Sequence, residues 1–354
     1  MAFAKKLSLP VFLTFVLFFL LILMIAGCHS LSVKKTPATP DENSYQSKWP
    51  FAFLSDKLNK VAGSVKKIYC IVEYEIFYFS ESDLLTEEKL KQLDLTKSNA
   101  VKSSFNETDF GTATVLQINR YGMILLTCAH IVSNPDTIVS FFSSGSGQSI
   151  IESVAVKKTQ MNYLRANDHK NNLLRILVTD NKNDLAFMCS NTPDDVCEMP
   201  VFNQVTGDAN DLEWGTPVCL FGYPGGYQMF TTAVVGNPNP TTSGDFIVDA
   251  TFNPGGSGSV VLVANTVTHD IDFVGIVRSA SGTFSNIVKP EKESHQEVYN
   301  PNLPYTGELY VKRVRNLNYG VTFVTSVNSI RDFYFHHRQL ITSEGYNLDN
   351  FFGI

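Results

Sequence analysis

Residues 253–259 read Asn-Pro-Gly-Gly-Ser-Gly-Ser, and the apolar run Val260 to Val263 follows them directly. Ser257 therefore lies between glycines, immediately before an expected strand. Glycine tolerates positive φ angles, and a chain that turns through several glycines can aim its N–H groups at one point. Donors that converge in this way stabilise a negatively charged oxygen. Ser257 is therefore a candidate nucleophile.

Two upstream segments supply what a serine hydroxyl lacks at neutral pH. Leu126 to His130 ends in an imidazole that can serve as a base, and Asn183 to Ala186 carries the Asp184 carboxylate that can orient it. Each candidate residue lies at the end of an expected strand, where loops converge. Taken singly, each segment is also typical of an ordinary structural turn. The chain order of the three residues is His, Asp, Ser.

The sequence around these segments predicts an all-β protein. Residues 112–118 and 123–127 flank the turn Asn119 to Gly122, which is a hairpin signal. About a dozen short strands separated by Gly, Pro, Asn and Asp favour barrels or sandwiches. The other candidate strands are residues 68–74, 137–142, 151–157, 173–178, 185–189, 217–221, 230–235, 245–250, 258–263, 273–277 and 321–324.

Helical and loop segments are fewer. Apolar residues recur at helical spacing in 51–64, which predicts a short helix before the first strand. Residues 80–107 are polar, with a helix-like piece at 84–93, and we interpret them as an inserted surface loop. Residues 326–341 predict an amphipathic helix with Ser326 as its N-cap. His336 and His337 in that helix project in different directions and do not predict a ligand site.

Composition limits the class of protein. The chain has 354 residues, of which 44% are hydrophobic and 18% charged, so it can bury the core of one large or two medium domains. Without residues 1–27, two of the 28 basic residues are lost, and 26 remain against 34 acidic ones, a net charge of −8. This acidic balance disfavours nucleic acid as a partner.

The N-terminus predicts export. Lys5 and Lys6 precede the apolar run Leu9 to Ile25, and Ala26-Gly27-Cys28 follows. This pattern resembles the lipobox of bacterial lipoproteins, which implies a signal peptide over 1–27, acylation of Cys28 and a lipid anchor in the bacterial cell envelope. An uncleaved membrane anchor is the alternative, because the run approaches the roughly 18 to 20 residues that span a bilayer. Residues 28–50 predict a flexible tether.

The cysteines predict no metal site. Acylation of Cys28 leaves five cysteines, an odd number, and their spacing is not that of metal ligands. Cys189 and Cys197 are close enough in sequence to close a short disulfide loop in an oxidising compartment. Buried apolar thiols on strands are the equally open alternative.

Together and in order, the three candidate segments resemble the trypsin-like serine peptidases, most closely the bacterial high-temperature-requirement branch, from about Leu58 to Arg331. The resemblance implies two six-stranded antiparallel β-barrels (chymotrypsin-like) with a C-terminal helix. It places the peptidase domain at 51–335, with barrel one at about 62–200 and barrel two at about 210–325, and the helix and tail at 326–354. The further matching segments are Gly111 to Ala113, Trp214 to Val218, Gly222 to Gly226, Asp249 to Gly255 and Asn318 to Phe323.

This resemblance also implies roles for the candidate residues. His130 is the general base and then the general acid, Asp184 orients it, and Ser257 is the acylated nucleophile of a serine endopeptidase. The N–H groups of Gly255 and Ser257 form the oxyanion hole. The substrate is a protein or peptide, and neither a cofactor nor a metal is expected. Only residues 332–354 follow Arg331, so we expect no PDZ-like domain.

Several residues depart from the family pattern. Gly256 replaces the aspartate with which digestive members bind a new N-terminus, so that activation is not expected. Ser259 replaces a usual glycine, as it does in bacterial glutamyl endopeptidases. Gly111-Thr112-Ala113 lacks a second glycine. Arg278 stands where a small hydroxyl residue is usual, and its guanidinium is expected either to face solvent or substrate or to compete with His130 for Asp184.

The resemblance also locates the substrate pocket. Thr251 corresponds to its floor, with Phe252, Ser279 and Ala280 near its walls and Arg278 on the adjoining substrate strand. The absence of an acid there predicts a small or medium apolar side chain before the scissile bond.

Two other functions use the same residues. The alternative is a non-catalytic envelope lipoprotein that keeps the fold as a binding module, with its triad made idle by Arg278, by a malformed oxyanion loop or by the 80–107 insertion over the cleft. Esterase activity on small acyl groups would use the same triad. However, α/β-hydrolases carry their triad in the order Ser, Asp, His.

Overall fold

A computed structural model describes residues 55–142, 149–165, 171–190, 199–240, 244–251, 253–290 and 309–354. Chain contacts separate two units, Met1–Trp49 and Pro50–Ile354, and all described residues belong to the second. The predicted signal peptide, the tether, Cys28 and Cys197 lie outside the described residues. None of the helices in the described ranges has the length and apolar character needed to cross a membrane.

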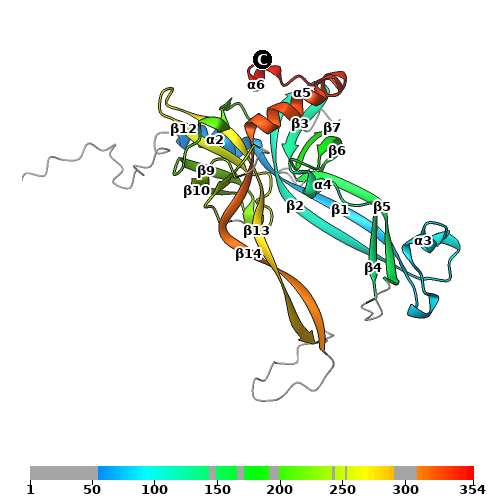
Figure 1. The fold of residues 1–354 in the computed structure, drawn as a ribbon. Coiled ribbons are helices and arrows are strands. Elements are labelled where there is room, and N and C mark those ends of the chain that lie inside the picture. Colours follow the sequence, from blue (N-terminus) through cyan, green and yellow to red (C-terminus); the bar gives the residue numbers. More distant parts are fainter. Residues whose placement is uncertain are drawn as a thin grey trace, which may run out of the picture. The chain divides into compact units, whose positions relative to one another are not determined.

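The first sheet closes into a barrel. Six antiparallel strands follow the order β1-β2-β3-β7-β6-β5, and β5 pairs back onto β1 (Figure 1). A seventh strand, β4, also pairs with β5, on the edge opposite to β1. The strands are β1 (Val65–Tyr78), β2 (Val101–Asn119), β3 (Gly122–Thr127), β4 (Thr137–Phe141), β5 (Ile151–Arg165), β6 (Asn171–Asp180) and β7 (Leu185–Ser190).

The second sheet closes in the same way, in the order β12-β9-β10-β11-β14-β13, with β13 paired back onto β12. The predicted pair of six-stranded antiparallel barrels is therefore confirmed. The short β8 pairs in parallel with β13 and was not predicted, because two residues carry no periodic signal. The strands are β8 (Val205–Thr206), β9 (Pro217–Gly222), β10 (Met229–Asn237), β11 (Asp245–Val248), β12 (Val260–Asn265), β13 (Asp270–Pro290) and β14 (Leu309–Ser326).

Helices cover the barrels rather than build them. The predicted C-terminal helix is confirmed as α5 (Val327–Ser343), and its N-cap Ser326 accepts the Ser329 N–H at 3.2 Å. Phe333 of α5 stacks on Phe187 of β7 with ring centroids 5.0 Å apart, which joins the helix to the first barrel's core. The other helical segments are α2 (Ser55–Ser64), α3 (Glu87–Leu90), α4 (Ala129–Val132), α6 (Asp349–Phe352), η1 (Glu81–Asp83), η2 (Leu95–Lys97), η3 (Ala209–Asp211) and η4 (Pro224–Gly226).

The predicted surface loop at 80–107 is wrong over its last quarter, residues 101–107. Residues 81–97 form η1, α3 and η2, but β2 begins at Val101 and pairs with Tyr78 of β1. Residues 101–108 are all exposed, and only Val101 and Phe105 among them are apolar, so their side chains give no alternating strand pattern. Their backbone nevertheless pairs with β1, and that pairing forms the strand.

Two more strands extend well past their predicted ends. The β13 segment predicted as 273–277 continues to Pro290, and the β14 segment predicted as 321–324 begins at Leu309. In Figure 1 these strands leave the second barrel together as a hairpin. The extension affects the surroundings of the site, because β13 passes directly beside Ser257.

Candidate functional site

His130 is placed by the end of a barrel strand. β3 ends at Thr127, and Cys128 leads into the single turn α4, of which His130 is the second residue. The N–H of Ala129 donates to the Asp184 carbonyl oxygen at 3.2 Å, which ties this turn to the β6–β7 turn. The His130 side chain remains 50% exposed. The backbone that carries the imidazole is therefore held in place, while half of the His130 side chain stays open to solvent.

Asp184 lies in the tight turn between β6 and β7, with a positive φ of 57°. Aspartate is one of the few non-glycine residues that adopt this region readily. Within the turn, the Asp180 carboxylate accepts the Asn183 side-chain amide at 2.6 Å, and Thr325 from the second barrel donates to the Asn183 carbonyl at 2.9 Å. Both barrels thus hold the aspartate in position.

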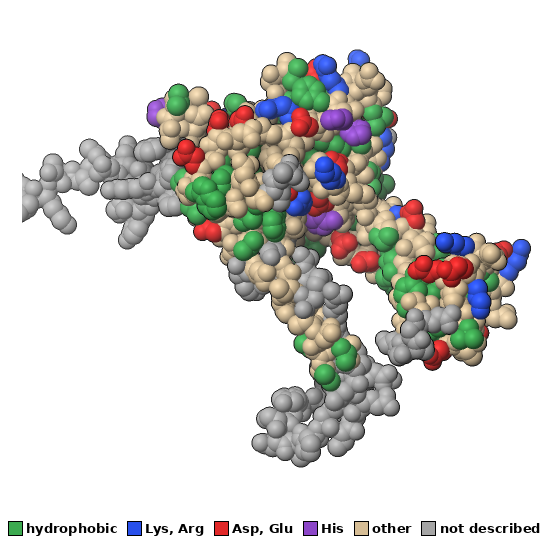
Figure 2. All heavy atoms as spheres, viewed as in Figure 1, with side chains coloured by type: hydrophobic (Ala, Val, Ile, Leu, Met, Phe, Trp, Pro, Cys, Tyr) green, Lys and Arg blue, Asp and Glu red, His purple; other side chains and the backbone are tan. Residues whose placement is uncertain are grey.

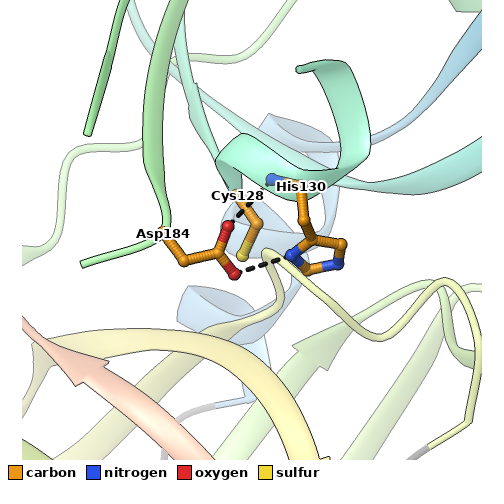
Figure 3. Close-up of side chains that lie close together, drawn as sticks. All are labelled: Cys128, His130 and Asp184. Carbon is orange, nitrogen blue, oxygen red and sulfur yellow. Dashed lines mark hydrogen bonds and ion pairs between the residues drawn. The ribbon is translucent and has the colours of Figure 1, made fainter. Parts of the chain in front are cut away.

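His130 and Asp184 make two contacts with each other (Figure 3). One carboxylate oxygen accepts the His130 backbone N–H at 2.8 Å, and the other lies 2.6 Å from the ring Nδ1. A carboxylate accepts hydrogen bonds, so Nδ1 carries the proton and, in the neutral ring, Nε2 keeps its lone pair. The pair therefore presents an oriented base.

The serine segment rests on the first barrel. The Thr112 N–H donates to the Ser257 carbonyl at 2.8 Å, and Thr127 donates to the Thr112 carbonyl at 2.7 Å. Gly258, at φ 84°, packs so closely that an added Cβ would lie 1.9 Å from the Thr112 carbonyl oxygen. Strands β2 and β3 therefore hold the backbone at Ser257 in place. Strand β3 also leads to His130.

The turn before Ser257 fixes two peptide planes. The Gly256 N–H donates to the Asn253 carbonyl at 2.9 Å, and Gly255 has φ 89°, as expected for a type II turn after Pro254. The carbonyl of Pro254 accepts the Gly225 N–H at 2.7 Å, and that of Gly256 accepts the Ser259 N–H at 3.1 Å. In a trans peptide the N–H points opposite to the carbonyl. The N–H groups of Gly255 and Ser257 therefore point away from these bonds.

The Ser257 hydroxyl contacts the strand beyond it. The side chain is 5% exposed, and Oγ donates to the Arg278 carbonyl oxygen of β13 at 3.2 Å. Within the described ranges, no hydrogen bond joins Ser257 to His130. The three candidate residues thus meet at the same strand ends, with the His130–Asp184 contact formed and the hydroxyl turned to β13.

Arg278 does not pair with Asp184. Its Nη1 lies 3.1 Å from the Asp245 carboxylate of β11, and the side chains are 22% and 3% exposed. Burial raises the pKa of the Asp245 carboxyl, and the Arg278 charge opposes part of that rise. The guanidinium is therefore mostly buried in an ion pair, which is neither of the two arrangements expected from the sequence.

A narrow cavity of about 20 Å³ lies beside the serine turn, where Gly256 and Ser259 line it. Of the predicted pocket residues, Thr251 lines it, whereas Arg278, Ser279 and Ala280 do not. The Phe252 side chain lies outside the described residues. The full lining is Leu220, Gly222, Pro224, Met229, Thr231, Thr251, Asn253, Gly256, Ser259, Val277 and Thr322, which includes no charged side chain.

Cys128 is a neighbour that sequence reasoning did not single out. Its sulfur lies within 4.8 Å of ligand atoms of both His130 and Asp184, as in Figure 3, so the three residue types match a metal-ligand set. The thiol is fully buried and donates to the Val277 carbonyl at 3.2 Å, and burial raises its pKa. A protonated thiol is a poor ligand, so this set fits a hydrogen-bonded His–Asp pair better than a metal site.

The remaining described cysteines are also free and buried: Cys70, Cys189 and Cys219. Cys189 is therefore a buried free thiol, which is the second of the two alternatives expected from the sequence.

Comparison with known proteins gives a family match over part of the chain. Residues 111–267 match the family model described as "Trypsin-like peptidase domain". No curated protein sequence matches the chain.

Solved structures that resemble the chain include the HtrA-type protease AlgW with a tripeptide, at 13% identity and TM-score 0.42, covering 82% of this chain and 64% of that one. A variant of AlgW with a decapeptide has 14% identity and TM-score 0.45, with coverages of 82% and 67%. A variant with a tripeptide has 13% identity and TM-score 0.43, with coverages of 81% and 62%. The chain thus spans between 62% and 67% of the length of these structures.

Proposed function

We propose that the protein is a serine endopeptidase that hydrolyses peptide bonds through an acyl-enzyme at Ser257, because residues 111–267 match the trypsin-like peptidase family model. The observation that carries the proposal is the His130–Asp184 pair, with Nδ1 2.6 Å from the carboxylate, at the strand ends that also hold the glycine-flanked serine. A peptidase of this kind needs a base, an orienting carboxylate and an oxyanion site around the nucleophile.

The proposed reaction uses the His130–Asp184 pair to activate Ser257. The Ser257 hydroxyl turns from the Arg278 carbonyl to Nε2 of His130, which takes its proton as Oγ bonds to the substrate carbonyl carbon. Asp184 stabilises the imidazolium that forms. The same imidazolium then gives its proton to the leaving amine, so that the peptide bond breaks and the acyl-enzyme remains. Water, deprotonated by His130, releases the acyl group and regenerates Ser257.

The oxyanion of each tetrahedral intermediate is held by the N–H groups of Gly255 and Ser257. The preceding carbonyls are already bonded to Gly225 and Ser259, so these donors keep their direction without reorganising during the reaction. The loss of one such donor costs on the order of 3 kcal/mol in the barrier.

The cavity beside the serine turn selects the residue before the scissile bond. Its volume of about 20 Å³ is little more than one water molecule requires, and its lining carries no charge. A small apolar side chain therefore fits, whereas Lys, Arg and large aromatic residues do not. Profiling with a peptide library tests this preference. Dominance of basic residues at that position would refute it.

The Arg278–Asp245 pair supports catalysis over the alternative of an idle binding module. The binding-module hypothesis depended partly on an Arg278 guanidinium that competes with His130 for Asp184. This guanidinium is paired with Asp245 instead. Hydrolysis of an internally quenched peptide, lost in both Ser257→Ala and His130→Ala, tests the activity. If the wild-type protein cleaves no member of a library of such peptides, the binding-module hypothesis replaces the proposal.

We also propose that the mature protein begins at an acylated Cys28 and is anchored by lipid in the bacterial cell envelope. The support comes from the sequence, in which Ile25-Ala26-Gly27-Cys28 follows an apolar run. Mass spectrometry of the mature N-terminal peptide, with and without globomycin, tests this anchor. Recovery of intact residues 1–27 from the mature protein would contradict it.

A further inference from the structure

A second and larger cavity lies under the C-terminal helices. It has a volume of about 840 Å³ and shares no lining residue with the cavity beside the serine turn. Small-molecule sites commonly measure about 300 to 1,000 Å³. We call it the α5–α6 cavity; it is lined by Leu116, residues 201–206, Arg331, Phe335 and residues 350–354. Its size is therefore that of a ligand site, and it is separate from the candidate catalytic residues.

The lining of the α5–α6 cavity is mostly apolar. The Phe351 ring lies 6.1 Å from that of Phe202 and 4.9 Å from that of Phe352, measured between centroids. Figure 2 shows hydrophobic side chains at the surface where Figure 1 labels α6. A ligand with an apolar body would remove this surface from water, which is favourable. Three of the apolar lining side chains are well exposed: Val205 (61%), Phe335 (43%) and Ile354 (52%).

Arg331 is the single charged side chain of this lining. Its Nη2 donates to the Thr206 hydroxyl at 3.5 Å and to the Gly207 carbonyl at 3.3 Å, which are both neutral acceptors. Its Nε is buried without an acceptor. The Asp208 carboxylate interacts with the guanidinium only at longer range and accepts the Asn328 amide at 2.8 Å. Among the described residues, the permanent charge of Arg331 therefore has no ion-pair partner.

The cation and an apolar wall of the cavity lie on the same face of α5. Arg331 and Phe335 are four residues apart, and helical side chains at this spacing are neighbours. A guanidinium binds a carboxylate through parallel hydrogen bonds, which are stronger than bonds between neutral groups. The surrounding apolar side chains lower the local dielectric and strengthen such bonds further. The cavity thus combines one site for a carboxylate with an adjoining apolar surface.

We propose that the α5–α6 cavity binds one free fatty acid, with its carboxylate on Arg331 and its chain along the phenylalanine side chains. A fatty acid has one charged end and no other hydrogen-bonding group, which matches one cation in a mostly apolar lining. A peptide would bring an N–H and a carbonyl with nearly every residue. The Phe202 N–H already donates to the Val115 carbonyl at 2.8 Å, and the Asn203 and Gln204 side chains bond to each other at 3.4 Å. These groups therefore offer a peptide backbone few partners.

Titration of the full chain with sodium decanoate and with 1-decanol tests the role of the charge, because the alcohol keeps the apolar chain and lacks the carboxylate. We expect decanoate to bind at least about tenfold more tightly. Arg331→Gln should remove this preference. Arg120→Gln, in the exposed β2–β3 turn, removes the same charge elsewhere and should keep it. Equal affinities in the wild type, or a preference that survives in Arg331→Gln, would overturn the proposal.

A second pair of variants leaves Arg331 in place. Phe335→Glu puts a carboxylate four residues from Arg331, where opposite charges interact, so the protein's own carboxylate competes with the ligand. Decanoate should then lose its preference over 1-decanol. Phe335→Gln is the matched control, because it has a similar size without the charge and should keep that preference. Phe335 is 43% exposed, so thermal midpoints should change little. If both variants keep the preference, the carboxylate does not bind at Arg331.

A decanoate with a terminal diazirine locates the bound chain. Photolysis followed by mass spectrometry should give crosslinks within residues 201–206 or 350–354. Crosslinks confined to other parts of the protein, such as the apolar run 9–25, would show that the proposal is wrong. So would binding of an apolar peptide with a free C-terminal carboxylate by a protein that does not bind decanoate. Ser257→Ala should bind decanoate as the wild type does, so this result is independent of the proposed peptidase activity.

Discussion

The Arg278 guanidinium lies 3.1 Å from the Asp245 carboxylate, in a pair that is almost removed from solvent. The pair joins β11 to β13 at the residue whose carbonyl contacts Ser257 Oγ. Removal of one partner leaves the other buried and uncompensated, which is costlier than the loss of an exposed pair.

Asp245→Asn is therefore expected to destabilise the fold by about 3 kcal/mol and to lower activity, because the released guanidinium is then free to reach Asp184. Urea unfolding and peptide hydrolysis measure the two effects. The double variant Asp245→Asn/Arg278→Ser should recover activity. If Asp245→Asn alone leaves both stability and activity unchanged, the pair has no role in holding Arg278 away from the site.

Asp184→Asn is expected to lower kcat about 10⁴-fold. An amide can donate to Nδ1, which favours the tautomer with the proton on Nε2 and removes the base. The substitution keeps the size of the side chain, so the thermal midpoint should change little. Steady-state hydrolysis and a melting curve on the same preparation test this pair of expectations. A loss of less than tenfold would show that Asp184 does not orient His130.

Gly255→Ala tests the oxyanion turn. Gly255 has φ 89°, and an added Cβ would lie 2.5 Å from the Tyr223 carbonyl oxygen and 2.4 Å from the Phe110 ring, so the turn must shift. We expect kcat to fall about 10² to 10³-fold. Gly215→Ala is the matched control, because Gly215 has φ 80° but open space around it. It carries the same backbone strain and should retain activity; equal losses in the two variants would assign the effect to strain.

Alkaline pH should destabilise the protein through its buried thiols. Burial raises the pKa of the Cys70 thiol from 9.0 to about 11. The unfolded state therefore loses its proton first, so stability is complete below pH 9 and declines as pH rises toward 11. Urea midpoints measured from pH 8 to 11 test this slope. Cys70→Ala should reduce this slope without removing it, because burial also raises the pKa of the Cys128, Cys189 and Cys219 thiols. A midpoint that is constant over this range in the wild-type protein would contradict the assignment.

The short segments that hold His130, Asp184 and Ser257 were predicted more accurately than the long strands around them. Gly255, Gly258, His130 and Asp184 lie in short segments whose conformation follows from local chemistry. The strand count around them predicted an all-β protein, and the family resemblance implied the two barrels. The structure then brings His130 and Asp184 into contact, which spacing alone could not show.

The wrong predictions concern features that depend on contacts between residues far apart in the sequence. Residues 101–107 form a strand because β1 pairs with them, and their mostly polar side chains give no sign of that pairing. The partner of Arg278 could not be predicted either, because Asp245 is 33 positions away in the chain and reaches it only through the closure of the second barrel. Cys128 next to His130 was visible in the sequence, but its burial depends on the packing of both barrels.

Labelling of the wild-type chain with a fluorophosphonate probe, followed by mass spectrometry, tests the account most directly. The probe acts as an acyl-group mimic and needs both an activated serine and an oxyanion site. We predict one modified residue, Ser257, with labelling lost in Ser257→Ala and in His130→Ala. Wild-type protein that stays unlabelled, or that is labelled at another residue while Ser257 is unmodified, would contradict the central claim.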